Sequence, residues 1–252
     1  MMERKPFLMI QFRTDAGKQL EQISVQEKLA AYQEAAPDIQ FFDAFDSEND
    51  ALFAAPETWL ASFQGVILGG SSEFYFGGNT SDEFEAKHQA MLVRLQPFME
   101  YILEQDFLTL GICFGHQFLA HALGTSVVAD PHQAETGSLC VALSDTGRQD
   151  PLFVGMPESW KAFFVHRDSA MELPRESVLL GSGERSQVGA FRHKNRIYGV
   201  QFHPELDRHD LPSRLALHPE YVAEGADVFL SSVDLVPHAG RILHNFVELC
   251  RR

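Results

Sequence analysis

One short segment of the chain combines a nucleophilic side chain with the small residues that a sharp turn needs. The pentapeptide Gly-Ile-Cys-Phe-Gly occupies residues 111–115, between an apolar run that predicts a strand at 108–112 and a helical pattern at 116–123. A strand-to-helix turn strains its central residue, and glycines two positions before and after it relieve the crowding. Because Cys113 then lies at the amino end of a helix, the helix dipole favours its thiolate form. The spacing predicts a cysteine nucleophile.

A cysteine nucleophile needs a base, and the base needs a group that orients it. The segment Gln-Phe-His-Pro-Glu at 201–205 closes a predicted strand at 197–202 and contains both types of group. In extended backbone, residues i and i+2 point the same way, so Glu205 can reach across Pro204 to the imidazole of His203. A second His-Pro-Glu, at 218–220, follows a helical pattern. We predict a surface helix boundary there, without a catalytic role.

The composition excludes several classes of protein. The chain has 252 residues and a formal charge of −15, which would repel nucleic acid and anionic membranes. Its three cysteines are far apart and odd in number, which suits neither a disulfide framework nor a zinc cluster, and we assign Cys140 and Cys250 structural roles. The sequence shows neither a signal peptide nor a membrane span. We expect a cytoplasmic protein with no nucleic-acid or membrane partner.

Short apolar runs alternate with helical patterns, which predicts a parallel sheet flanked by helices. The first half gives strands at 7–12, 39–42, 66–68 and 108–112, and helices at 25–36, 56–63, 82–105 and 116–123. The second half gives strands at 139–143, 160–165, 178–182, 187–191 and 197–202, then helical patches from 211 to 252, the last at 239–249. We predict a single α/β domain at 1–252, whose mostly parallel sheet is extended by antiparallel strands in the second half. A helical C-terminal extension would begin at about residue 207.

With the motifs at 111–117 and 201–205, and a Gly-Gly loop after the third strand, the sequence resembles the class I (triad-type) glutamine amidotransferases. The likeness is to a stand-alone protein similar to the amidotransferase of GMP synthase. It covers residues 66–205 and implies a flavodoxin-like three-layer sandwich. It also implies hydrolysis of the glutamine side-chain amide through a γ-glutamyl thioester, with release of ammonia. By this resemblance Cys113 is the nucleophile, His203 the general base and acid, and Glu205 its orienting partner.

The resemblance also implies the remaining site residues. The backbone N–H groups of Gly70 and Phe114 would form the oxyanion hole, with Gly69 in the same loop. Gln117 would contact bound glutamine. The segment 165–168, which contains His166 and Asp168, would receive the α-amino and α-carboxylate groups of the substrate. Neither a metal nor an organic cofactor is required.

Family members that complete a biosynthesis carry, or assemble with, a synthase unit, and we expect none within this chain because the segment up to Arg252 leaves no room for one. A separate ammonia-accepting protein therefore stays open as a partner, as does a homo-oligomer. Three other functions also stay open. One is hydrolysis of a γ-glutamyl peptide or conjugate on the same fold, and another is a non-catalytic regulatory or binding module. The third, an α/β-hydrolase with a cysteine elbow, is disfavoured because its acid precedes the histidine in the chain.

Overall fold

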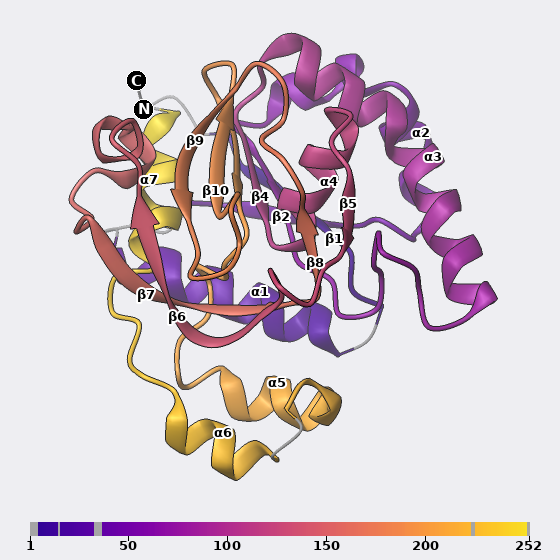
Figure 1. Ribbon diagram of the computed structural model, residues 1–252. Coiled ribbons are helices and arrows are strands. Elements are labelled where there is room, and N and C mark those ends of the chain that lie inside the picture. The colour runs from indigo at the N-terminus through magenta and orange to yellow at the C-terminus, as the bar shows by residue number, and fades with distance from the viewer. Residues whose placement is uncertain (1–4, 15, 33–36, 223–224, 251–252) are drawn as a thin grey trace.

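The computed structural model describes residues 5–14, 16–32, 37–222 and 225–250. Within these residues, nine strands form one sheet in the order β2-β1-β3-β4-β11-β10-β9-β6-β7 (Figure 1). Their bounds are β1 Phe7–Gln11, β2 Ile39–Asp43, β3 Val66–Leu68, β4 Thr109–Ile112, β6 Glu135–Leu143, β7 Ser159–His166, β9 Ser177–Ser182, β10 Ala190–His193 and β11 Ile197–Val200. Two further strands, β5 (Val127–Ala129) and β8 (Asp168–Ala170), form a small antiparallel sheet.

The large sheet changes character along its width, as the sequence predicts. Strands β2, β1, β3, β4 and β11 are mutually parallel. From β11 onward, β10, β9, β6 and β7 pair antiparallel. The carboxyl ends of β3, β4 and β11 therefore lie at one edge of the sheet, where open parallel sheets bind their ligands.

Helices α1 (Gly17–Tyr32) and α7 (Arg241–Leu249) pack on one face of the sheet, and α2 (Asp50–Ala54), α3 (Asp82–Gln105) and α4 (Phe114–Ala122) pack on the other. The remaining helices are α5 (Leu211–Leu217) and α6 (Ala226–Ser232). Side chains alternate between the two faces along a strand, so β1 contributes residues to the hydrophobic core on each face. Phe7 and Met9 lie in a core with residues of α1 and α7, while Leu8 and Ile10 lie in another with residues of α3 and α4. The result is the predicted three-layer sandwich.

Several predicted element bounds were wrong for local reasons. The first helix begins at Gly17 instead of residue 25, and its predicted end at 33–36 lies outside the described residues. The predicted helix at 56–63 is two 3-10 turns, η2 (Pro56–Thr58) and η3 (Leu60–Ser62). There the hydroxyl of Thr58 donates to the carbonyl of Ala55, an alternative to the regular helical ladder. The strand predicted at 187–191 starts at Ala190, because the backbone N–H of Gln187 donates to the Gln133 side chain instead of a strand.

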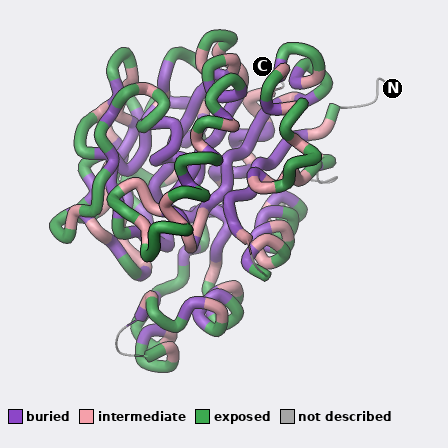
Figure 2. Tube along the Cα trace, turned by 90° about the vertical axis from the view of Figure 1, so that its right-hand side faces the viewer, coloured by how far each residue is buried: buried purple, intermediate pink, exposed green. Residues whose placement is uncertain are grey.

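Helical segments follow residue 207. Helices α5 and α6 flank the 3-10 turn η6 (Pro219–Tyr221) and lie below the main body in Figure 1, while α7 returns to the sheet. Figure 2 shows that α5 and α6 carry buried positions as well as exposed ones. Phe246 of α7 packs against Phe7 of β1, with ring centroids 5.8 Å apart. That the chain is one domain remains our proposal, and this packing supports it.

No helix among the described residues has the length and apolarity needed to cross a membrane.

Candidate active site

Cys113 occupies a strained turn between β4 and α4. Its backbone has φ 50° and ψ −100°, a conformation that non-glycine residues rarely adopt, and it caps the amino end of α4. The flanking glycines are required by close contacts. A Cβ at Gly111 would lie 2.5 Å from the carbonyl oxygen of Gly115, and one at Gly115 would lie 2.2 Å from that of Leu68. The predicted reason for glycine at both positions is confirmed.

The thiol of Cys113 is almost enclosed and faces three polar groups. Only 4% of the residue is exposed. Its Sγ lies 3.8 Å from the carbonyl oxygen of Val165, and Nε2 of Gln201 lies 3.7 Å from the sulfur. Cys113 also lies close enough to His203 for its charge to raise the pKa of the imidazole. The sequence-predicted nucleophile and base are therefore neighbours.

His203 and Glu205 form a buried pair at the carboxyl end of β11. The distance from Nδ1 of His203 to Oε1 of Glu205 is 2.7 Å, and the backbone N–H of His203 is fixed by the carbonyl of Phe163. Burial opposes protonation of His203, but the negative charges of Glu205 and Cys113 outweigh it and raise the pKa of the imidazole to about 10. Burial alone would raise the pKa of Glu205, yet the cation on His203 lowers it. The pair is thus held as imidazolium and carboxylate.

A residue that the sequence did not single out, Arg214 of α5, also acts on this pair. Its charge contributes to the lowered pKa of Glu205. Among the described residues, Oε2 of Glu205 and Nε of Arg214 are both buried without a hydrogen-bond partner. Burial lowers the pKa of Arg214 to about 10, and the nearby cation of Arg13 adds to this, so Arg214 is still charged at neutral pH. Helix α5 therefore contributes a cation to the His203–Glu205 pair.

The Gly-Gly loop lies against the turn at Cys113, but one of its predicted donors is occupied. The backbone N–H of Gly115 donates to the carbonyl of Gly69 at 3.0 Å, which fixes the loop beside α4. The N–H of Gly70 donates to Oε1 of Glu21, on α1, at 3.0 Å. The N–H of Phe114, in the first turn of α4, has no partner within the helix, as for any helix start.

The three polar side chains predicted to contact substrate lie near Cys113 but are engaged in other contacts. Gln117 donates from Nε2 to the carbonyl of Asp168 at 2.7 Å. The imidazole of His166 lies 3.1 Å from Oε2 of Glu135, and the carboxylate of Asp168 accepts from the backbone N–H of Gly77 at 2.6 Å. In the segment 165–168, the group that lies beside the sulfur of Cys113 is the backbone carbonyl of Val165.

The second His-Pro-Glu differs from its prediction in one respect. Pro219 begins η6, so the predicted helix boundary is confirmed. His218 is not a surface residue, however: 8% of it is exposed, and its ring stacks on Tyr221 with centroids 5.1 Å apart. It lines the same cavity of about 40 Å³ as His203 and Arg13. The tripeptide alone gave no sign that α5 and η6 would fold over the site.

The described residues contain no group of three or more His, Cys, Asp or Glu side chains that could hold a metal ion.

Comparison with known proteins assigns a family to this fold. Residues 86–213 match the family model described as glutamine amidotransferase class-I. The chain is similar to a glutamine-hydrolyzing GMP synthase subunit from Methanosphaera stadtmanae, at 30% identity over 74% of this chain and 75% of that protein. It is also similar to the subunit of the same name from Methanopyrus kandleri, at 39% identity over 60% of this chain and 71% of the relative.

Some relatives are matched over less than two thirds of their own length. GMP synthase of Thermosipho africanus is 40% identical over 44% of this chain and 21% of its own length. The matched region spans 23% of the Thermosipho melanesiensis enzyme and 65% of the GMP synthase subunit from Thermoplasma volcanium. The chain thus spans about a fifth of the two Thermosipho relatives.

Two solved structures share the fold over almost the whole chain. A glutamine amidotransferase from Thermotoga maritima superposes with a TM-score of 0.72 at 18% identity, covering 98% of this chain and 99% of the other. A protein described as a GMP synthase subunit, from Thermoplasma acidophilum, gives a TM-score of 0.65 at 22% identity, covering 99% and 96%. These likenesses confirm the predicted flavodoxin-like fold with its mostly parallel sheet.

Proposed function

Because this chain belongs to the class I glutamine amidotransferase family, we propose that it hydrolyses the side-chain amide of glutamine through a thioester on Cys113. One observation carries the proposal. A cysteine in a strained turn at a helix start, at the end of β4, lies beside a buried His203–Glu205 pair at the end of the neighbouring strand β11. A nucleophile, a base and an orienting acid, each beside the next, are the parts that covalent amide hydrolysis needs.

In the proposed first step the sulfur of Cys113 attacks the amide carbon, and the carbonyl π electrons move to oxygen. The imidazolium of His203 then donates its Nε2 proton to the amide nitrogen, the C–N bond breaks and ammonia leaves. Glu205 stabilises the imidazolium and keeps its Nδ1 proton directed at the carboxylate, 2.7 Å away. The product of this half-reaction is the γ-glutamyl thioester.

In the second step, neutral His203 accepts a proton from water while the water oxygen attacks the thioester carbon. The C–S bond breaks, glutamate leaves, and the thiolate and imidazolium are restored. The pKa of His203, raised to about 10, favours the return of this proton to the imidazole. Each step passes through a tetrahedral intermediate with negative charge on oxygen.

The oxyanion needs donors that are in place before reaction. Phe114 is suited to this role because its N–H lies at the positive end of α4. The role of Gly70 remains a prediction, and in the structure its N–H donates to Glu21. We further propose that Gln117 and the backbone of residues 165–168 bind the amino-acid end of glutamine, near the Val165 carbonyl.

We propose a separate protein as the acceptor of ammonia. The relatives from Methanosphaera and Methanopyrus are each named as one subunit of GMP synthase, which implies that those proteins work with another polypeptide. We also propose a cytoplasmic location, in keeping with three cysteines that form no disulfide among the described residues.

A substrate profile tests the proposal. Ammonia and glutamate are measured with glutamine, a γ-glutamyl dipeptide and a γ-glutamyl amine, for the wild type and for Cys113→Ala. We expect the wild type to release ammonia from glutamine and the variant to release none, with an unchanged circular dichroism spectrum. The matched control is Cys250→Ala, since Cys250 follows α7 and its thiol donates to the side chain of Gln64. Cleavage of γ-glutamyl dipeptide alone would favour the conjugate hydrolase, and ammonia from Cys113→Ala would refute the nucleophile.

A further inference from the structure

The carboxylate of Glu21 occupies the backbone donor that the family motif assigns to the oxyanion. Glu21 is 1% exposed, and its Oε1 accepts the N–H of Gly70 at 3.0 Å. Its Oε2 accepts from the side-chain amide of Gln11 at 3.0 Å. A buried carboxylate held by this many donors does not leave readily, since each hydrogen bond to it is charge-assisted. The N–H of Gly70 is therefore committed to Glu21.

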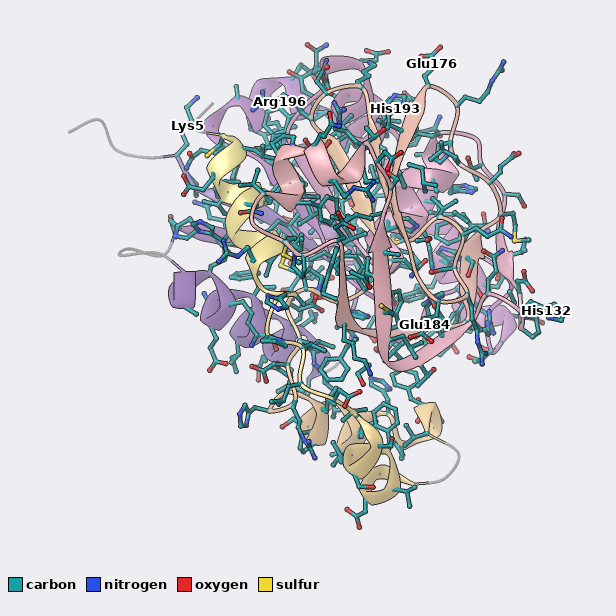
Figure 3. All side chains as sticks on the ribbon, turned by 60° about the vertical axis from the view of Figure 1, so that its left-hand side comes forward. Lys5, His132, Glu176, Glu184, His193 and Arg196 are labelled. Atoms are coloured by element: carbon teal, nitrogen blue, oxygen red, sulfur yellow. The ribbon has the colours of Figure 1, made fainter. Side chains whose placement is uncertain are left out.

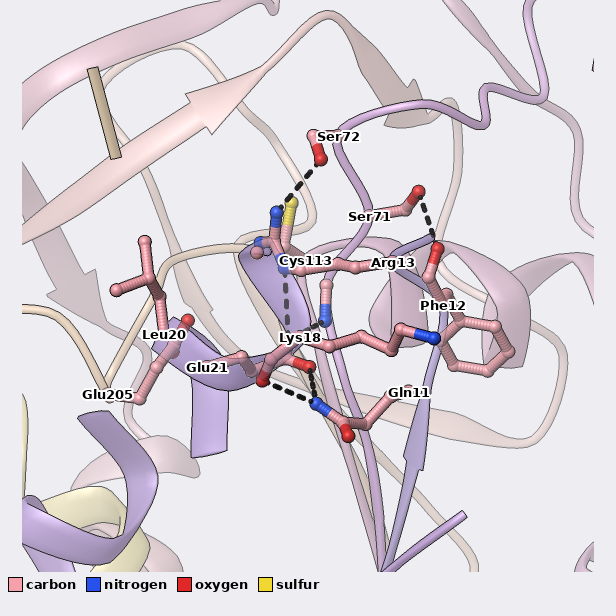
Figure 4. Close-up of polar contacts among 12 residues, drawn as sticks. Gln11, Phe12, Arg13, Lys18, Leu20, Glu21, Ser71, Ser72, Cys113 and Glu205 are labelled. Carbon is pink, nitrogen blue, oxygen red and sulfur yellow. Dashed lines mark hydrogen bonds and ion pairs between the residues drawn. The ribbon is translucent and has the colours of Figure 1, made fainter. Parts of the chain in front are cut away.

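Arg13, in the segment that follows β1, brings a cation to the same place. Its Nε lies 3.4 Å from Oε1 of Glu21, and its Nη1 donates to the hydroxyl of Ser72 at 3.1 Å (Figure 4). Two sides of the guanidinium are thus fixed, one by the helix α1 and one by the Gly-Gly loop. Among the described residues, Nη2 takes no hydrogen-bond partner, and Arg13 lines the cavity beside His203.

The free nitrogen of Arg13 points into the catalytic site. A side chain placed on Gly70 would meet Nη2 of Arg13 at 3.0 Å and Cε1 of His203 at 3.3 Å, so both atoms border the same small space. Burial disfavours the charged guanidinium, but neighbouring negative charges, Glu21 and Cys113 among them, raise its pKa. A permanent cation with an available N–H therefore lies between the loop and the base.

We propose that Arg13 is a catalytic residue that stabilises the oxyanion through Nη2, in place of the N–H of Gly70, and that Glu21 is its positioning residue. This inference rests on the proposed function. When the sulfur of Cys113 bonds to the amide carbon, the carbonyl π pair becomes a lone pair on oxygen. Nη2 of Arg13 and the N–H of Phe114 donate hydrogen bonds to that oxygen. Arg13 keeps its proton throughout, and the pair returns to form the thioester carbonyl as the C–N bond breaks.

The central test compares Arg13→Met with the wild type. Removal of one oxyanion donor lowers kcat about 10²–10³-fold, and KM for glutamine should change little because ground-state glutamine carries no oxyanion. Binding of glutamate γ-semialdehyde, whose addition to Cys113 creates the same oxyanion, should weaken by a similar factor. Alkylation of Cys113 by iodoacetamide, which forms no oxyanion, should slow far less than kcat, because it loses only the attraction between the Arg13 cation and the thiolate. Arg196→Met is the control, since Figure 3 shows Arg196 at the end of the molecule opposite α5 and α6.

Variants at Glu21 distinguish two roles for this carboxylate, which are to position Arg13 or to block the N–H of Gly70. If Glu21 holds Arg13, then Glu21→Gln lowers kcat and aldehyde affinity together and leaves iodoacetamide alkylation unchanged. If Glu21 merely blocks the N–H of Gly70, the same variant raises kcat, which would overturn the proposal. Arg13→Lys keeps the positive charge but not the planar guanidinium with its several N–H donors. It should therefore bind the aldehyde better than Arg13→Met but less well than the wild type. This variant also tests the proposal if Arg13→Met does not fold.

Failure of the inference differs from failure of the proposed function. Aldehyde binding does not require turnover, so the affinity for the aldehyde can be measured even if the protein does not hydrolyse glutamine. Equal aldehyde affinity in wild type and Arg13→Met contradicts the role of Arg13. A kcat loss matched by an equal loss of iodoacetamide reactivity also contradicts it, because Arg13 would then act on the sulfur. Absence of ammonia from the wild type instead refutes the glutaminase activity itself.

Discussion

The chain contains the tripeptide His-Pro-Glu twice, and its two copies have different surroundings. At 203–205 the imidazole and carboxylate are both buried and 2.7 Å apart. At 218–220 the corresponding distance is 3.2 Å, and the side chain of Glu220 is 64% exposed. An exposed carboxylate interacts weakly with its partner because water screens the charge. The same three residues therefore form a strong ion pair in one place and a weak contact in the other.

The difference originates in the elements that precede the two copies. The first follows β11, whose end lies beside β4 and the turn at Cys113. The second follows α5 and begins η6, where the ring of His218 stacks on Tyr221. The chemistry of the His-Pro-Glu tripeptide therefore depends on the element that it follows.

Replacing the two histidines gives the largest expected contrast. His203→Ala removes the base and the proton donor, and general acid–base groups contribute about 10²–10⁴-fold to rate. His218→Ala removes a packed ring, so we expect a loss of about 1 kcal/mol in stability with kcat nearly unchanged. Steady-state glutaminase kinetics and thermal unfolding of both variants measure this. A greater loss of kcat in His218→Ala would show that the second copy is the catalytic one.

Replacing the two glutamates, Glu205 and Glu220, should give a smaller difference in kcat than replacing the two histidines. Glu205→Gln keeps the shape but removes the charge that holds His203 as imidazolium, and we expect kcat to fall about tenfold to 10²-fold, below the full range for an acid–base group. Glu220→Gln changes a mostly exposed carboxylate, and its kcat should equal that of the wild type. The comparison needs only glutamate release at saturating glutamine. Equal effects of the two substitutions would mean that burial of Glu205 has no catalytic consequence.

Arg214 distinguishes the first copy further, because its charge helps to lower the pKa of Glu205. Arg214→Met should raise that pKa, so the acidic limb of the profile of kcat against pH moves to higher pH. Arg208→Met is the matched control: Arg208 lies in the same extension and donates to the carbonyl of Leu230. An unshifted acidic limb in Arg214→Met would contradict a role for the extension in the charge of the catalytic pair.

The last contrast concerns stability instead of rate. The pKa of His203 is raised from 6.5 to about 10 on folding. A group with a raised pKa stabilises the fold fully below its unfolded value and loses that contribution as pH rises through the folded value. Wild type should therefore lose more stability than His203→Asn between pH 6.5 and about 10, and each 1 kcal/mol corresponds to about 2–4 °C in Tm. Parallel curves of Tm against pH would contradict the ion pair.

Much of the fold was predictable because its signals are local. The strand at 66–68 and the helix at 82–105 have the predicted bounds, since a compact apolar run and a Ser-capped helical pattern need no distant partner. The turn at Cys113 was equally predictable, because the two glycines that permit it lie two residues away on each side.

The rest of the site depends on contacts between distant parts of the chain. Glu21 meets Gly70 across 49 residues, and Arg214 approaches Ser24 across 190. No periodicity or motif encodes such meetings, so Arg13, Glu21 and Arg214 were missed. Of these three residues, only Arg13 could have been predicted from its position. It follows β1, and residues at the carboxyl end of a parallel strand face the ligand site. The burial of His218 was missed for the same reason: it depends on how α5 and η6 fold back.

Trapping the covalent intermediate tests the central claim most directly. The protein is incubated with glutamine, quenched in acid and digested, and the peptides carrying Cys113, Cys140 and Cys250 are analysed by mass spectrometry. We predict a γ-glutamyl adduct on Cys113 alone, which accumulates least in His203→Ala, where no imidazolium protonates the leaving nitrogen. Release of ammonia with no adduct on Cys113, or with an adduct on Cys140 or Cys250, would contradict it.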